Sequence, residues 1–258
     1  GFDVEEGVAG IKTAFTASYG SGRPIIGILG EFDANAGISQ KRKPVKEARV
    51  PGGAGHGCGH NLFGTASLGA AIAIKEQIEK GNIKGTVIFY GTPAEETIFA
   101  KVWMVREGLF DKLDVCMDWH PGDEIQAGTQ STKALVDFRV KFHGSSAHAS
   151  SDPWNGRSAA DAMELYTTGL NYYREHIEPT ARIHYQIEKA GDVVNVVPDY
   201  AQIWTRLRQN NRAGVDVLYE RALDIAKGAA LMTGTTYETM LISGIYEIQV
   251  NRTGAAIL

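Results

Sequence analysis

Short apolar runs that alternate with helical stretches limit the possible folds of this chain more than any other feature. Residues 24–29 read PIIGIL and residues 86–90 read TVIFY, and turn-forming residues bound both runs, so each is expected to be a buried strand. Helices are predicted over about 61–80 and 99–107, and a third strand over 114–118. Strands and helices that alternate at this spacing indicate a parallel α/β layer.

The pattern changes after about residue 130. Strands with alternating polar and apolar residues are expected at 135–142, 182–188, 201–208 and 235–242, and helices at 159–173 and 215–232. This β-α-β-β-α-β order is the split β-α-β arrangement. We therefore expect an α/β domain over residues 1–130 and a second, ferredoxin-like α+β domain over residues 131–243.

Charge and composition exclude several classes of protein. The net charge of −4 does not favour nucleic acid or anionic lipid as a partner. The longest apolar-leaning stretch without charge, residues 61–74, is too short to span a bilayer. Two cysteines, Cys58 and Cys116, cannot build a disulfide framework and are typical of a reducing cytoplasm. We therefore expect a cytoplasmic protein with no signal peptide.

A glycine-rich loop places a thiol and two imidazoles directly before the first predicted helix. Residues 55–64 read GHGCGHNLFG. Thiolate and imidazole are preferred ligands of zinc-like metals, and glycine allows an ion or substrate to approach closely. Cys58 and His60 are therefore candidate ligands, and His56 ranks below His60. The alternatives are a buried cysteine in a tight turn and a phosphate-binding loop, although the run matches neither G-x-G-x-x-G nor the Walker pattern.

Further candidate ligands follow the predicted strands. Asp33 follows the first strand, Glu95 and Glu96 the second, and His120 the third. Ligands of parallel α/β sheets lie at the carboxyl ends of the strands, so these side chains are expected to meet there. Adjacent carboxylates on extended backbone point to different sides, so one glutamate can bind metal while the other acts as a base on water. Asp33 can orient a metal ligand. The alternatives are a solvated acidic turn for Glu95 and Glu96 and a structural role for His120.

Five stretches of the chain together resemble a known family. They are residues 30–34, 55–64, 92–96, 144–149 and 195–199. The chain resembles the dinuclear-metal amidohydrolases and exopeptidases that include aminoacylases, hippurate hydrolases and glutamate carboxypeptidases, and within them the branch of the B-type subunits of p-aminobenzoyl-glutamate hydrolase. This resemblance implies cleavage of the amide bond of N-acyl or aryl-amide amino acids or of dipeptides, with two divalent ions, Zn(II) or Mn(II), as cofactors.

The resemblance also implies roles for the residues of the first domain. Cys58, His60, Glu96 and His120 match the metal ligands of the family, with Cys58 in a position to bridge the two ions. Glu95 matches the general base that activates the attacking water. Residues 1–130 accordingly resemble the amino-terminal part of the catalytic domain.

Residues 131–243 resemble the inserted dimerisation domain of the family, which implies a homodimer. Its His148 matches a histidine that reaches the active site of the partner subunit and helps to stabilise the oxyanion. Asn195 and Arg208 match residues that hold the substrate, Arg208 by pairing with its carboxylate. Residues 244–258 resemble the beginning of the return to the catalytic domain.

The chain departs from the family pattern at both ends. The long amino-terminal segment is largely absent, and the chain stops soon after the insertion, without the last histidine ligand. We therefore expect a chain truncated at both ends. Two alternatives stay open: a non-catalytic dimerising scaffold with an incomplete metal site, and a cysteine hydrolase that uses Cys58 with a nearby histidine as base.

Overall fold

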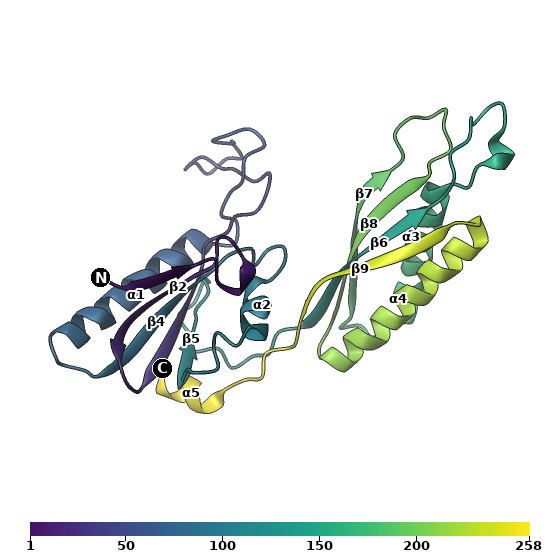
Figure 1. The fold of residues 1–258 in the computed structure, drawn as a ribbon. Helices are drawn as coiled ribbons and strands as arrows, with labels where there is room; N and C mark the ends of the chain where they lie inside the picture. The colour runs from purple at the N-terminus through teal and green to yellow at the C-terminus, as the bar shows by residue number, and fades with distance from the viewer. The chain divides into compact units, whose positions relative to one another are not determined.

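Two separate sheets organise the chain, and each belongs to its own compact unit (Figure 1). The computed structural model describes residues 1–258 and divides them into Gly1–Gln126 and Ala127–Leu258. None of the helices has both the length and the apolar composition that crossing a membrane requires.

The first unit contains a five-stranded sheet with the strand order β1-β2-β4-β3-β5. Its elements are β1 (Asp3–Glu6), a 3-10 turn (Val8–Gly10), β2 (Phe15–Ser21), β3 (Ile25–Glu31), α1 (His60–Glu79), β4 (Gly85–Thr92), α2 (Ala100–Arg106) and β5 (Val115–Met117). As predicted, β3 pairs in parallel with β4 and β5, whereas β1 with β2 and β2 with β4 are antiparallel. The sheet is therefore mixed rather than wholly parallel. Strands β1 and β2 were not predicted; the four residues of β1, DVEE, are all exposed and lack an apolar pattern.

Residues of β4 alternate between two apolar clusters of the first unit. Val87 and Phe89 belong to one cluster, and Ile88 and Tyr90 belong to the other. Successive side chains of a strand point to opposite faces, so the sheet is covered on both faces. Such burial explains why this strand reads as a continuous apolar run in the sequence. The buried strands fix the sheet edge from which the candidate site residues extend.

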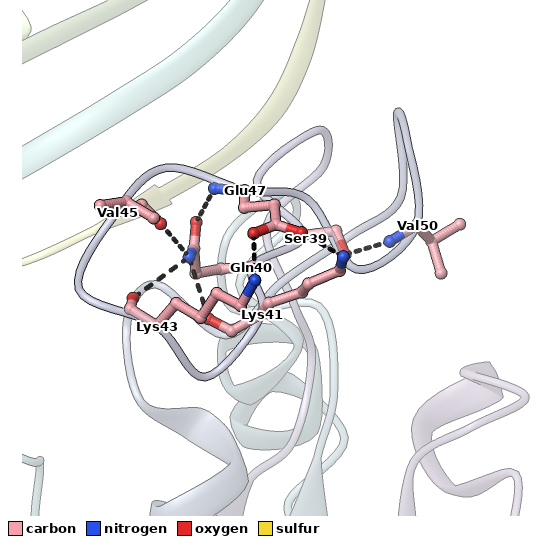
Figure 2. A network of polar contacts seen from close by, with 7 residues as sticks. All are labelled: Ser39, Gln40, Lys41, Lys43, Val45, Glu47 and Val50. Atoms are coloured by element: carbon pink, nitrogen blue, oxygen red, sulfur yellow. Dashed lines mark hydrogen bonds and ion pairs between the residues drawn. The ribbon is translucent and has the colours of Figure 1, made fainter.

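The segment between β3 and α1 contains no helix or extended strand, and one side chain organises much of it (Figure 2). The Gln40 side-chain amide donates to the carbonyl oxygens of Lys41 (2.9 Å) and Val45 (2.8 Å) and accepts a hydrogen bond from the Glu47 backbone amide at 3.2 Å. Glu47 forms ion pairs with Lys41 and Lys43. Local contacts therefore order the basic stretch of this loop.

The second unit contains a four-stranded antiparallel sheet with the strand order β7-β8-β6-β9. Its elements are β6 (Ala134–His143), a 3-10 turn (Pro153–Asn155), α3 (Ala159–Tyr173), a second 3-10 turn (Arg174–His176), β7 (Arg182–Ala190), β8 (Tyr200–Gln209), α4 (Arg212–Thr233), β9 (Thr236–Ile245) and α5 (Arg252–Ile257). From β6 to β9 the order is β-α-β-β-α-β, as the sequence predicted. Side-chain caps from Ser158 and Asn211 mark the starts of α3 and α4.

The two faces of this second sheet differ in chemistry. One face packs against α3 and α4 through a large apolar cluster that includes Phe138, Tyr166 and Ile203. Strand alternation places ion pairs on the opposite face. There Asp137 accepts two hydrogen bonds from Arg206, at 2.8 and 2.6 Å, although the aspartate side chain is completely buried.

Candidate metal centre

The start of helix α1 lies against the end of strand β3. A Cβ atom on Gly64 would lie 2.7 Å from the carbonyl oxygen of Glu31, so only glycine allows this approach. His60 lies one turn earlier on the same helix face. The close approach therefore places His60, whose side chain is 1% exposed, beside the carboxylates of Glu31 and Asp33.

The contacts of the His60 ring define which nitrogen faces the site. Nδ1 lies 3.1 Å from Asp33 Oδ1 and 3.2 Å from the Asp33 carbonyl oxygen. Nε2 lies 2.9 Å from Glu31 Oε2, so it is the ring nitrogen that faces the other carboxylates of the site. Histidines that ligate metals commonly donate the other ring N–H to a carboxylate or carbonyl in this way.

Cys58 and His120 come together although they are far apart in the sequence. Cys58 Sγ lies 3.3 Å from His120 Nε2, and His120 Nδ1 lies 3.0 Å from the Pro121 carbonyl oxygen. The second histidine therefore also presents Nε2 to the site. Donor atoms of Cys58, His60 and His120 all lie within 4.8 Å of one another. His56 is exposed and belongs to neither donor group of this region.

A second group of donor atoms shares His60 with the first. Glu31, His60 and Glu95 offer ligand atoms that also lie within 4.8 Å of one another. Glu31 was not singled out from the sequence, although it belongs to the GEFDA stretch that carries part of the family resemblance. The available signal was a carboxylate that ends a strand which is otherwise glycine and aliphatic, IIGILGE.

Negative charge and burial shape the electrostatics of the site. Burial raises the pKa of Cys58 to about 11, with further contributions from Glu96, Glu95 and Glu31. The pKa of Glu95 is also raised, first by burial and then by the charge of Glu31. A thiol with such a raised pKa is a poor nucleophile at neutral pH, which disfavours the cysteine-hydrolase alternative.

The turn that carries the two glutamates has an unusual backbone. Ala94 and Phe99, on either side of it, adopt positive φ values of 55° and 53°. The Ala94 carbonyl oxygen accepts hydrogen bonds from the backbone amides of Ile98 and Phe99, both at 3.0 Å. Left-handed backbone at residues other than glycine is costly and gathers at functional sites. The turn thus holds Glu95 and Glu96 in a defined, half-buried position.

The donor set fits a divalent metal ion. Glu31 Oε2, His60 Nε2 and Glu96 Oε1 are buried and have no hydrogen-bond partner. Buried polar atoms are rarely left in this state, and each costs roughly 1–3 kcal/mol when it is unsatisfied. A cation among these atoms would satisfy them together, and the mixture of thiol, imidazole and carboxylate suits Zn(II) or a related ion.

The remaining predicted residues lie in the second unit. The loops that carry His148 and Asn195 pair through backbone hydrogen bonds, from Ala149 N to Asn195 O (3.0 Å) and from Val197 N to Ala147 O (2.9 Å). His148 is exposed, and its Nδ1 accepts hydrogen bonds from the backbone amides of Ser150 and Ser151, both at 3.2 Å. Arg208 lies on β8 opposite Arg182 of β7. The structure thus brings His148 and Asn195 together and places Arg208 on the adjoining sheet.

Comparison with known sequences identifies relatives over nearly the whole chain. The profile of peptidase family M20/M25/M40 matches residues 28–245. The chain is 45% identical over 257 residues to the B-type subunit of p-aminobenzoyl-glutamate hydrolase from Escherichia coli strain K12, a match that covers 98% of this chain and 53% of that protein. It is 33% identical over 220 residues to Xaa-Arg dipeptidase of Homo sapiens, a match that covers 84% and 47%. The chain therefore spans about half the length of the curated relatives it matches.

Solved structures show the same fold. An aminobenzoyl-glutamate utilization protein from Klebsiella pneumoniae superposes with a TM-score of 0.70 at 24% identity, over 96% of this chain and 58% of that one. A dinuclear metal binding peptidase of the M20 family from Bacillus subtilis gives a TM-score of 0.60 at 20% identity, over 99% and 67%. Because the family profile covers most of the chain, the conclusion is direct: this chain belongs to peptidase family M20/M25/M40.

Proposed function

We propose that this chain carries the metal centre of a metal-dependent amidohydrolase or peptidase. The proposed substrates are N-acyl or aryl-amide amino acids, such as p-aminobenzoyl-glutamate, and dipeptides. The observation that carries the proposal is the convergence of the Cys58, His60 and His120 donor atoms within 4.8 Å of one another. The names of the relatives, a p-aminobenzoyl-glutamate hydrolase and a dipeptidase, support the same class of bond.

Four side chains of the first unit would hold two divalent ions, Zn(II) or Mn(II). They are Cys58, His60, Glu96 and His120. When bound, the ions would make a nearby water more acidic and polarise the amide carbonyl of the substrate. Asp33 would keep the His60 ring in the orientation that presents Nε2, through the contacts at 3.1 and 3.2 Å.

Glu95 is the proposed general base. Its carboxylate would take a proton from the attacking water and pass that proton to the nitrogen of the leaving amine. Glu95 and Glu96 share a turn whose backbone is well defined, so the two carboxylates can hold different positions in the site. A proton-transfer group needs such a fixed position, because it has to stay within hydrogen-bond reach of the water.

The second unit would supply contacts to the substrate and to a second copy of the chain. We place the homodimer interface in residues 131–243. Nδ1 of His148 accepts two backbone hydrogen bonds, so the proton of the neutral ring lies on the exposed Nε2. This N–H would donate to the oxyanion in the partner subunit's active site. Asn195 and Arg208 would hold the substrate, Arg208 through its carboxylate.

Metal loading and hydrolysis together test the proposal. The purified chain is supplied with Zn(II) or Mn(II), its metal content is measured by elemental analysis, and hydrolysis of p-aminobenzoyl-glutamate, N-acyl amino acids and dipeptides is followed. We expect two ions per chain and hydrolysis that a chelator abolishes. Hydrolysis that survives the chelator would favour a cysteine nucleophile, and a chain that binds no metal would favour the non-catalytic scaffold.

A further inference from the structure

We propose that Glu31 is an additional metal donor of this centre and that Lys101 holds its carboxylate in place. This inference rests on the proposed metal-dependent function and extends it to two residues to which no role has been given. It concerns the donor group that Glu31, His60 and Glu95 form.

Glu31 occupies a position that ordinarily disfavours a carboxylate. It is the last residue of β3, and only 5% of its surface is exposed. Transfer of an ionised carboxylate from water to such a site is costly unless the charge is compensated. A glutamate at this point of the sheet therefore requires a cationic partner.

Lys101 compensates one of the two carboxylate oxygens. It lies on α2, and its Nζ forms an ion pair with Glu31 Oε1. The lysine side chain is 27% exposed, so its ammonium keeps part of its contact with water, whereas the glutamate side chain is 7% exposed. This contact fixes the rotation of the Glu31 carboxylate and leaves Oε2 directed at His60.

The second oxygen of Glu31 faces the imidazole ring of His60. Glu31 Oε2 lies 2.9 Å from His60 Nε2, yet neither atom takes part in a hydrogen bond. His60 Nδ1 already contacts the carboxylate and the carbonyl oxygen of Asp33, so Nε2 is the ring nitrogen left for a further partner. A buried carboxylate oxygen and a buried imidazole nitrogen therefore converge without a hydrogen bond, and a cation bound by both atoms would satisfy them.

The two donor groups suggest that each group binds one of the two ions. One group contains Cys58 and His120 and the other contains Glu31, while His60 belongs to both; Glu95, the proposed base, lies beside Glu31 and His60. If Glu31 is a donor, its removal should weaken one ion and spare the other. A purely structural ion pair between Glu31 and Lys101 would not produce such a selective loss.

Zinc titration of the full, metal-free chain tests this inference. Isothermal titration calorimetry with ZnCl₂ is carried out on the unsubstituted chain, Glu31→Gln, Lys101→Met and, as the matched control, Glu76→Gln on the exposed surface of α1. We expect Glu31→Gln to weaken one of the two ions by about 100-fold or more and Lys101→Met by about 10-fold, since even residues that only orient a ligand change affinity 10–100-fold. Glu76→Gln should bind as the unsubstituted chain does.

The outcomes separate this inference from the function on which it rests. Zinc binding by the unsubstituted chain that is unchanged in Glu31→Gln overturns the role of Glu31 alone. A chain that binds no zinc overturns both proposals. If Glu31→Gln does not fold, as judged by circular dichroism, the double variant Glu31→Gln/Lys101→Met removes both charges and replaces it. The metal-free variants could also melt at a lower temperature and still bind zinc with full affinity. That result would show that Glu31 and Lys101 have a structural role only, and it would overturn the inference.

Discussion

Two buried carboxylates, one in each unit, show opposite ways of holding a charge. Asp137 of the second unit directs both oxygens at the Arg206 guanidinium, at 2.8 and 2.6 Å. Glu31 of the first unit has one oxygen on Lys101, and the other lies 2.9 Å from His60 Nε2. The Arg206 guanidinium compensates the charge of the aspartate, whereas one oxygen of the glutamate is left for a bound metal ion.

The difference teaches how to distinguish a structural ion pair from a binding site. Burial alone does not separate them, since both carboxylates are almost fully enclosed. The distinguishing property is whether the hydrogen-bonding capacity of the buried atoms is used up. Both carboxylate oxygens of Asp137 accept hydrogen bonds, whereas three buried atoms of the centre around His60 have no hydrogen-bond partner.

The largest expected effect is on kcat and comes from Glu95, the proposed general base of the first unit. Glu95→Gln should lower kcat about 10²–10⁴-fold, because proton transfer by a positioned side chain contributes about that much. Metal content, measured by elemental analysis on the same samples, should stay unchanged. If hydrolysis and metal content fell together, Glu95 would be a ligand of the ion rather than the base.

A second prediction concerns His148, the proposed oxyanion donor of the second unit. His148→Ala should lower kcat about 10²–10³-fold, the usual effect of removing one oxyanion donor, and should leave metal content nearly unchanged. Equal loss of turnover and metal would exclude the oxyanion role. Mixing His148→Ala with inactive Glu95→Gln chains sharpens the test. Recovered hydrolysis would show that each copy completes the site of its partner.

A third prediction tests the ion pair between Asp137 and Arg206. Asp137→Asn should destabilise the second unit by about 3 kcal/mol, because it leaves Arg206 beside a neutral side chain. Urea denaturation followed by circular dichroism measures the loss. Zinc affinity should not change, in contrast to Glu31→Gln. A change in zinc affinity would remove the distinction between the two carboxylates.

The smallest expected effect is on the pH dependence of stability. The pKa of Glu188 is lowered, first by its hydrogen bonds from Arg139. A depressed carboxyl pKa contributes stability above the unfolded value, 4.5, and this stability disappears as the pH falls through the folded value. Glu188→Gln should therefore cost about 1 kcal/mol at pH 7 and much less in acid. A pH-independent cost, measured by urea denaturation at several pH values, would contradict the ion pair.

Much of the fold follows from hydrophobic pattern. The runs PIIGIL and TVIFY became β3 and β4 because strands buried on both faces are apolar throughout. Helix α3 has the predicted bounds, Ala159–Tyr173, since a serine cap precedes a clear apolar face. Strands β1 and β2 and the short helix α5 (Arg252–Ile257) were not predicted, because none of them carries such a continuous apolar run. The family resemblance inferred from the motifs is confirmed by the profile match.

The site was only partly accessible from sequence. Position after a strand was enough to nominate Glu95, Glu96 and His120, because the topology of a parallel sheet brings such residues to one edge. The role of Glu31 depends on tertiary contacts, namely those with Lys101 and with His60. No spacing in the sequence encodes those contacts. The assigned roles of the site residues stay predictions until the experiments above are done.

Asp33 connects the two segments that carry most of the candidate metal centre. One of its oxygens contacts His60 at 3.1 Å, and the other accepts a hydrogen bond from the Glu96 backbone amide at 3.0 Å. The same carboxylate thus clamps two segments that come from distant parts of the chain. The helix start and the glutamate turn should therefore protect each other from hydrogen exchange and open together as one cooperative element.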